Sequence, residues 1–336
     1  MLDAIVKANA GFASAYGDDD YTRAVETRLS EVFEREVTAF LVPTGTAANA
    51  LALAHVTPPW GSILCHADSH IATDECGAPE FFGGGLKLVG LLGEGGKIAA
   101  ATLKRALGSE SGHRPHRVVA STLSITQATE AGTVYSLDEI ARLCDIAHEH
   151  SLVVHMDGAR FANAIVHLNA TPARMTWRSG IDVLSLGVTK AGALAAEAIL
   201  FFDPARAAFM AERRKRAGHL ISKHRFVAAQ FAAILAEDRW LALARHANSM
   251  ASRLSEKLAT LGLAPVWPVE ANIVFVALSR ALDTRLKTAG AQYYVRPSGE
   301  LNLGRDQLLA RLVTCFATQE GEVDRFVQLC QDFLDA

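Results

Sequence analysis

Two short apolar runs decide the fold of this chain: LVVHMDGAR at residues 152–160 and DVLSLGVTK at residues 182–190. Both are rich in β-branched and apolar residues, alternate little, and carry their polar groups at the C-terminal end, which is typical of buried parallel strands. The C-terminal ends of parallel strands face the ligand crevice of an open sheet. The pattern therefore predicts that Asp157 and Arg160 lie with Lys190 at one crevice.

An acid and a lysine at two strand ends suit the chemistry of pyridoxal 5'-phosphate (PLP). A lysine amine forms a Schiff base with the aldehyde of this cofactor, and a carboxylate keeps the pyridine nitrogen protonated, so that the ring accepts electrons. Lys190 and Asp157 are the candidates for these two roles.

Strand and helix patterns alternate from residue 40 to residue 202, which indicates βαβ units and a mostly parallel sheet. From about residue 240 the pattern changes to a long helix at 242–261, strands within 272–278 and 308–318, and a final helix from Glu320. We therefore predict an α/β fold, with a large domain at residues 1–239 and a small α+β domain at residues 240–336.

Composition excludes several classes of protein. The 336 residues are half hydrophobic and carry a net charge of -3, which gives no footprint for nucleic acid or an anionic membrane. No apolar run reaches the roughly 18 residues of a membrane span, and the N-terminus does not resemble a secretory signal. The five cysteines are an odd number without paired short spacing, so we expect reduced thiols in a cytoplasmic protein and no zinc site.

The segment AFLVPTGTAANALALAHV at residues 39–56 predicts a strand, a turn and an Ala-rich helix. Gly45 and Thr46 fall where the helix begins, so free N–H groups and a hydroxyl would form an anion site for a phosphate. Most single turns of this kind are only helix caps. The downstream lysine makes this turn the leading candidate for the phosphate cup.

A polar loop with His70, Asp74, Glu75 and Cys76 follows the next predicted strand. The spacing matches no closed zinc pattern, so we predict no metal site. A lone histidine is more often structural than catalytic. Because His70 follows a strand and faces the same crevice, a stacking or acid–base role is favoured over the structural alternative.

Local signals also predict helix starts. Asp20 or Thr22 is the expected cap of the helix that ends near Phe33, and Ser136 with Glu139 forms the expected capping box of the helix at 137–149. The Asp18 to Asp20 run is expected to lie at a helix N-terminus and not to bind metal.

Arg311 is expected to open the otherwise apolar strand RLVTCF. A cation there is costly unless it meets an anion. Either a bidentate grip on a substrate carboxylate or an internal ion pair would satisfy it. The residues alone leave both alternatives open.

Six segments occur in order over most of the chain: PTGTAAN, HIATDECGAPEFF, ITQATEAGTVY, HMDGARFANA, LSLGVTKAG and RLVTCFAT. Together they resemble the low-specificity L-threonine aldolases, which are PLP enzymes of the aspartate-aminotransferase fold, PLP fold type I. The resemblance implies that Lys190 forms the Schiff base and that Asp157 binds the ring nitrogen. It also implies that the phosphate is held by Gly45 and Thr46, that His70 stacks on the ring, and that Arg160 and Arg311 lie by the substrate, with Arg311 on its carboxylate.

The resemblance also implies an activity: cleavage of L-threonine, L-allo-threonine and related β-hydroxy-α-amino acids to glycine and an aldehyde. Relatives are typically cytosolic homotetramers, built as dimers of dimers whose active sites are shared between chains. A residue of the basic run at 212–225, with Lys223 suspected, would then contact the cofactor phosphate of a neighbouring subunit. Some relatives have a histidine in the loop that here contains Ala128, Thr129 and Glu130. The expected base is therefore His70, directly or through a water held with Glu75.

Three alternatives stay open. One is another fold type I PLP activity, such as β-elimination or serine hydroxymethyl transfer. Relatives usually begin with a Ser-Asp-Asn or Ser-Asp-Thr segment whose serine lies near the substrate, and this sequence starts at Met1, just past it. A non-catalytic PLP-binding protein is therefore the second alternative. A nucleotide-binding protein is the third, disfavoured because the G-x-G-x-x-G turn and the P-loop are missing.

Overall fold

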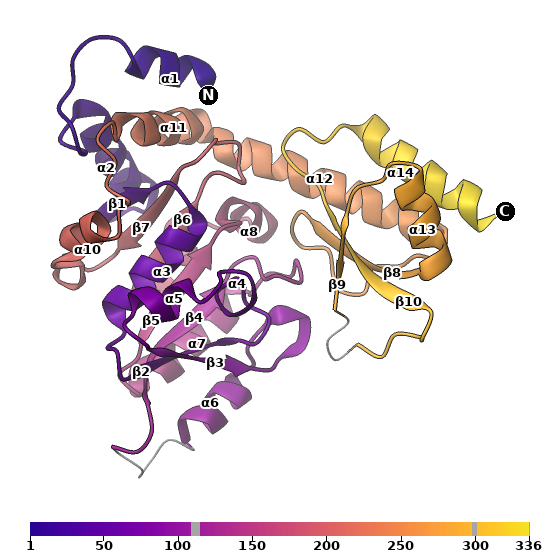
Figure 1. Cartoon of the computed structure of the whole chain (residues 1–336), viewed down its shortest axis with the longest axis horizontal. Helices are drawn as coiled ribbons and strands as arrows, with labels where there is room; N and C mark the ends of the chain where they lie inside the picture. Colours follow the sequence, from indigo (N-terminus) through magenta and orange to yellow (C-terminus); the bar gives the residue numbers. More distant parts are fainter. Residues whose placement is uncertain (109–114, 298–300, 336) are drawn as a thin grey trace.

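The computed structural model of the chain describes residues 1–108, 115–297 and 301–335. Within these residues a seven-stranded sheet and a three-stranded sheet organise the molecule (Figure 1). The large sheet contains β1 (Thr38–Val42), β2 (Gly61–His66), β3 (Lys87–Leu91), β4 (Val119–Thr126), β5 (Val153–Gly158), β6 (Val183–Gly187) and β7 (Glu197–Phe201). The small sheet contains β8 (Ile273–Ser279), β9 (Tyr294–Arg296) and β10 (Gln307–Val313).

The large sheet has the strand order β1-β7-β6-β5-β4-β2-β3. Strand β7 runs antiparallel to both of its neighbours, and the other adjacent pairs are parallel. The reason is the short link at residues 188–196, which is too short for the crossover that a parallel strand needs. The prediction of a mostly parallel α/β sheet is therefore confirmed.

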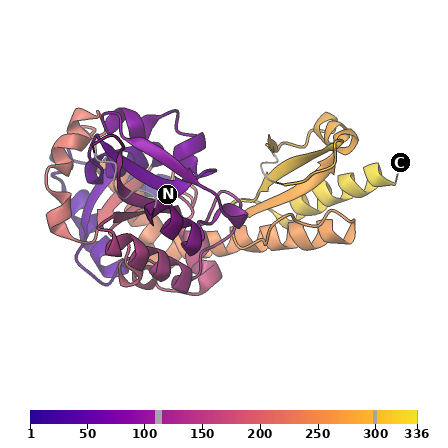
Figure 2. The same ribbon diagram turned by 90° about the horizontal axis from the view of Figure 1, so that it is seen from below.

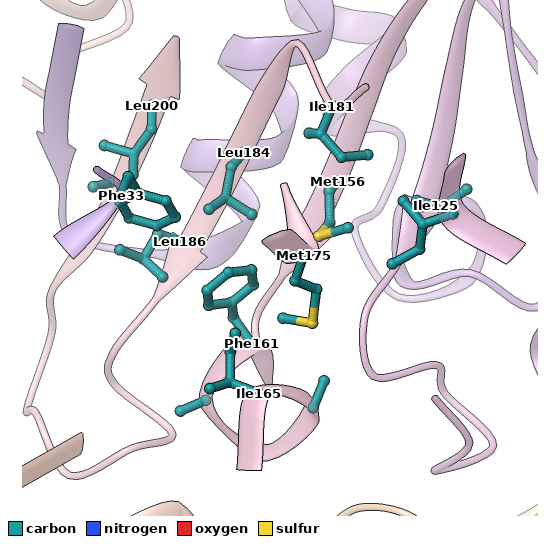
Figure 3. Close-up of a cluster of buried hydrophobic side chains, with 14 of the residues drawn as sticks. Phe33, Ile125, Met156, Phe161, Ile165, Met175, Ile181, Leu184, Leu186 and Leu200 are labelled. Carbon is teal, nitrogen blue, oxygen red and sulfur yellow. The ribbon is translucent and has the colours of Figure 1, made fainter. Parts of the chain in front are cut away.

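Both faces of the large sheet are covered, and the strand residues alternate between two apolar layers. Leu184 and Leu200 point to the larger layer, whereas Val183 and Ile199 point to the other. Figure 3 shows the larger layer, which contains side chains of β4, β5, β6 and β7 together with Phe161 of α8. Burial on both faces explains why these strands are apolar runs without alternation in the sequence.

Helices connect the strands and form the two covering layers (Figure 1). The helices before α12 are α1 (Leu2–Ala8), α2 (Asp20–Val32), α3 (Gly45–Val56), α4 (His70–Thr73), α5 (Ala78–Phe82), α6 (Ala100–Gly108), α7 (Leu137–Glu149), α8 (Phe161–Leu168), α9 (Pro172–Met175), α10 (Met210–Arg216) and α11 (Arg225–Leu235). The capping box of Ser136 and Glu139 is confirmed at α7. The expected cap of α2 is wrong: Asp19 is the cap, since its carboxylate accepts hydrogen bonds from both the backbone N–H and the hydroxyl of Thr22.

The small sheet packs with α12 (Arg239–Thr260), α13 (Arg280–Thr288) and α14 (Glu320–Leu334) around a second apolar cluster. Figures 1 and 2 show α12 running from one lobe of the molecule into the other. Its first turns contribute Trp240 and Ala244 to the main core, and its later turns contribute Leu254 and Leu258 to the second cluster. Because one helix serves both cores, the domain boundary at residue 239 stays a prediction.

Arg311 lies in the middle of β10, opposite Phe275 of β8 and Tyr294 of β9. The expectation that Arg311 opens its strand is wrong, because pairing with β8 starts four residues earlier, at Gln307. Among the described residues, no helix has the length and apolar character needed to cross a membrane, and no group of three His, Cys, Asp or Glu side chains is arranged for a metal ion.

Candidate active site

Asp157 lies at the C-terminal end of β5, between Thr126 of β4 and Ser185 of β6. Its side chain is buried, and both carboxylate oxygens are fixed by hydrogen bonds. The amide of Asn49 donates to Oδ2 over 2.8 Å, and the backbone N–H of Ala159 donates to Oδ1 over 2.9 Å. Two donors hold the carboxylate in one orientation, as a partner for a protonated ring nitrogen requires.

The N-terminus of α3 points a set of backbone donors at the same edge of the sheet. Thr44 caps the helix, and its hydroxyl accepts from the N–H of Ala47 over 3.1 Å. Within the described residues, no acceptor is paired with the N–H groups of Gly45 and Thr46. A side chain at Gly45 would meet nothing within 4 Å, so the space beside these donors is open. The N–H groups and the helix dipole together suit a phosphate group.

Lys190 lies three residues after β6, in the turn that leads to β7. The pKa of its amine is lowered, first by desolvation and then by the charge of Arg160, while Asp157 and Glu130 act in the opposite direction. The residue is exposed in the isolated chain, yet the protein around its amine still lowers the pKa. A lowered pKa increases the fraction of neutral amine, which is the nucleophilic form.

His70 is the first residue of α4, and its Nδ1 lies 2.8 Å from Oε1 of Glu75. The side chain of Glu75 is fully buried, whereas that of His70 is 30% exposed. The hydrogen bond to Glu75 is the main cause of the raised pKa of His70, and burial raises the pKa of Glu75. The described residues offer no partner for Nε2 of His70, so this nitrogen is available on the exposed side of the ring.

Two arginines bring positive charge to the site from different elements. Arg160 lies two residues after the end of β5, is buried, and donates from Nε to Oδ1 of Asn272 over 3.1 Å. Arg311 lies across from it on β10, and its Nη2 is 3.5 Å from Oε2 of Glu130. Burial and the charge of Arg160 lower the pKa of Arg311 to about 10.

Both alternatives for Arg311 have support in this geometry. The contact with Glu130 is an internal ion pair, but its 3.5 Å separation is long for a charge-assisted hydrogen bond. The Nε–H of Arg311 is buried and has no hydrogen-bond partner in the part of the chain that the structure describes. A buried N–H donor without an acceptor destabilises the fold. A carboxylate of a ligand would supply the missing acceptor.

A second ion pair joins the small sheet to Asp74, the residue that follows α4. Arg296 of β9 donates from Nη2 and Nη1 to the two carboxylate oxygens of Asp74, over 2.9 and 3.3 Å. No local pattern predicts this pair, because the two residues are 222 positions apart. Asn49 was also missed as an individual residue, although it lies one helical turn after Gly45, on the helix expected to bind phosphate.

Each predicted site residue lies at the C-terminal edge of the large sheet or opposite it, on β10. The negative charge of Asp157 acts to raise the pKa values of Lys190, Arg160 and His70, which places these three side chains within electrostatic reach of it. The suspected Lys223 lies apart from this group, as an exposed residue before α11. The type of sheet and this set of residues define the class of protein: a PLP-dependent enzyme of fold type I.

Comparison with known proteins identifies the family. The model of the β-eliminating lyase family matches residues 1–281. The low specificity L-threonine aldolase of Pseudomonas sp. (strain NCIMB 10558) is 43% identical over 294 residues, which cover 87% of this chain and 84% of the relative. The solved structure of threonine aldolase from Leishmania major is 27% identical, with a TM-score of 0.92, and the match covers 99% of this chain and 95% of that one.

The chain therefore belongs to the β-eliminating lyase family and, within it, to the low-specificity L-threonine aldolases, as its motifs predicted. Serine palmitoyltransferase of Sphingomonas wittichii shares the fold alone: it is 15% identical, with a TM-score of 0.71 over 99% of this chain and 82% of that one.

Proposed function

We propose that this protein is a carbon–carbon lyase that cleaves L-threonine, L-allo-threonine and related β-hydroxy-α-amino acids to glycine and an aldehyde, acetaldehyde in the case of threonine. The observation that carries the proposal is the 43% identity to a low specificity L-threonine aldolase across most of both chains. The cofactor is PLP, on which this family depends, and the donors and acceptors at the sheet edge suit its phosphate, ring nitrogen and aldehyde.

Each group of the cofactor has a matching group in the protein. The amine of Lys190, with its lowered pKa, is the covalent anchor for the aldehyde. The carboxylate of Asp157 would keep a proton on the ring nitrogen, and the N-terminus of α3 at Gly45 and Thr46 would hold the phosphate. His70 would stack on the ring. When bound, the cofactor supplies an electron sink for the electrons of the broken bond.

The protein also orients the substrate and moves its proton. Arg311, assisted by Arg160, holds the carboxylate of the amino acid, which fixes the rotation about the bond to its α-carbon. Nε2 of His70, directly or through a water, accepts the proton of the β-hydroxyl group. Loss of that proton turns the hydroxyl oxygen into the carbonyl oxygen of the departing aldehyde, and a proton returned to the α-carbon completes glycine.

We further propose a cytoplasmic homotetramer, built as a dimer of dimers with the active sites shared between chains. The 43% identity to a bacterial aldolase and the apolar side chains left exposed on this single chain support it. Phe12, Phe209 and Leu194 are each more than half exposed. Sedimentation analysis of the purified protein tests the assembly, and a monomer at micromolar concentration would contradict it.

The first experiment is the visible spectrum of the purified protein before and after borohydride, followed by peptide mapping. A yellow protein whose reduced label maps to Lys190 supports the anchor role. Acetaldehyde release from L-threonine then tests the reaction, and a serine-plus-folate assay separates it from hydroxymethyl transfer. A protein that binds the cofactor but releases no acetaldehyde from either threonine isomer would overturn the proposed reaction.

A further inference from the structure

Three buried polar side chains form a continuous line beneath His70. Glu75 follows α4, Asn49 lies on α3, and Asp157 ends β5, and each is at most 4% exposed. Oε1 of Glu75 is 2.8 Å from Nδ1 of His70 and 2.8 Å from Nδ2 of Asn49. The same Nδ2 is 2.8 Å from Oδ2 of Asp157. The base candidate and the partner of the ring nitrogen are therefore linked through two further residues.

The hydrogens along this line can be counted. The amide nitrogen of Asn49 has two hydrogens, and it faces one carboxylate oxygen with each. The opposite orientation of the amide would place its oxygen against both carboxylates, so the observed orientation is the one that chemistry permits. Oε1 of Glu75 accepts from Asn49 and has a second lone pair for His70. Nδ1 of His70 then carries a hydrogen, and Nε2 keeps its lone pair.

We propose that Glu75 and Asn49 are positioning residues: they hold the hydrogen of His70 on Nδ1, leave Nε2 as the proton acceptor, and link this base to the carboxylate of Asp157. The inference rests on the proposed function, because it gives His70 the basic nitrogen that the cleavage needs. It goes further by assigning roles to two residues that do not themselves touch the reacting atoms.

Two orphaned atoms support a role beyond stability. Oε2 of Glu75 and Oδ1 of Asn49 are buried, and residues 1–108, 115–297 and 301–335 provide no hydrogen-bond partner for either atom. Buried polar groups without partners destabilise a fold, and native proteins keep few of them. If Glu75 and Asn49 had only a structural role, apolar side chains of similar size would stabilise the fold at least as well.

Within the described part of the chain, the acids that raise the pKa of His70 are Glu75 after α4, Asp157 from β5 and Glu130 from the loop after β4. The charge of His70 in turn lowers the pKa of the neighbouring Asp74. The hydrogen bond to Glu75 is the largest contribution that raises the pKa of His70, and burial opposes it. Replacing Glu75 by Gln therefore lowers the pKa of His70 and frees the ring to exchange tautomers. Replacing Asn49 by Ala acts in the same direction but less, because Glu75 then ionises less readily.

The test is ¹⁵N NMR of the cofactor-loaded protein labelled at histidine, with the His70 signals assigned from a His70→Phe sample. The wild type is expected to show the Nδ1–H tautomer. Glu75→Gln should lower the pKa of His70 by about 1, the lower end of the effect of a neighbouring opposite charge, and produce a mixture of tautomers. Asn49→Ala should give a smaller decrease, and the matched control Asp68→Asn, an exposed acid of the same loop, should give none.

An Nε2–H tautomer in the wild type would overturn the inference without any variant, and so would an unchanged His70 pKa in folded Glu75→Gln. The NMR result does not depend on turnover. A protein with the expected tautomer that releases no acetaldehyde would refute the proposed reaction and not this arrangement. An active protein with the opposite tautomer would refute only the arrangement.

Discussion

The two sides of the candidate site are built differently. On the large sheet, Asp157 is 3% exposed, and hydrogen bonds of 2.8–2.9 Å hold both of its oxygens. On the small sheet, Arg311 reaches across to Glu130 at 3.5 Å, and Arg296 reaches Asp74 through a partly exposed ion pair. The proposed cofactor side, on the large sheet, is thus fixed by buried hydrogen bonds. The proposed substrate side, on the small sheet, is held by ion pairs that a ligand can replace.

This contrast has a physical reason. A cofactor that stays bound benefits from groups that are already in place, because no reorganisation is then needed during the reaction. A substrate must enter and leave in each turnover, so its ligands need alternative partners when it is absent. Changes on the cofactor side should therefore have larger effects than changes to the ion pairs.

The largest effect is expected at Lys190. Lys190→Ala removes the covalent anchor and should lower kcat for threonine cleavage on the order of 10⁴-fold or more, as the loss of other covalent catalytic groups does. Lys104→Ala, at an exposed lysine of α6, is the matched control and should keep wild-type kcat. Acetaldehyde release measures both, and a Lys190→Ala protein with more than a tenth of wild-type activity would refute the anchor role.

His70→Phe keeps an aromatic ring in place but has no basic nitrogen. We expect kcat to fall by about 10²- to 10⁴-fold, the usual contribution of a general base, while PLP still binds. A cofactor titration followed by visible absorbance separates the two effects. Unchanged turnover in this variant would remove His70 from the base role.

Arg311→Ala tests the substrate side. Loss of one partner of a desolvated charged pair costs about 2–5 kcal/mol, so kcat/KM should fall by about 30- to 5,000-fold, mostly through KM. PLP affinity should stay unchanged, because Arg311 lies on the opposite sheet. Arg280→Ala, at an exposed arginine of the adjoining helix, is the control. An effect on PLP binding equal to that on KM would contradict the division between the two sides.

The buried side also predicts how stability depends on pH. His155 lies on β5 between the hydroxyl groups of Ser124 and Ser185, and burial lowers its pKa from 6.5 to about 4. Below pH 6.5 the His155 side chain is protonated in the unfolded chain, but in the folded chain it stays neutral down to about pH 4. The free energy of unfolding therefore decreases as the pH falls from 6.5 to about 4. At pH 5 the contribution of His155 to this loss is about 2 kcal/mol.

Urea unfolding at pH 7 and pH 5 measures this loss in the wild type and in His155→Gln, which cannot be protonated in this range. The variant should lose about 2 kcal/mol less between the two pH values. An equal loss in both proteins would mean that other groups cause the acid sensitivity.

The smallest effect is expected for the ion pair of Asp74 and Arg296. Both side chains are about one third exposed, so Arg296→Gln should change the free energy of unfolding by about 1 kcal/mol or less and KM by only a few-fold. A loss comparable to that of Arg311→Ala would show that this contact, too, contributes to the catalytic machinery.

Much of the fold and several site residues were predictable because their signals are local. The polar ends of the runs at 152–160 and 182–190 identified Asp157 and Lys190, and the turn at Gly45 marked a helix N-terminus. The prediction for the α2 cap failed by one residue, because Asp19, Asp20 and Thr22 are all acceptable caps and the path of the chain selects among them.

The sequence by itself determined the α/β sheet, the order of its elements and the chemistry at the strand ends. The reason is that hydrophobic periodicity, and the polar residues that end each apolar segment, can be read within a few residues. The tertiary structure decided which distant groups meet. Asn49 and Asp157 are 108 positions apart, and Arg296 and Asp74 are 222 apart. Such pairs depend on how α3 packs on the sheet and how β9 and β10 face it, which no local pattern encodes.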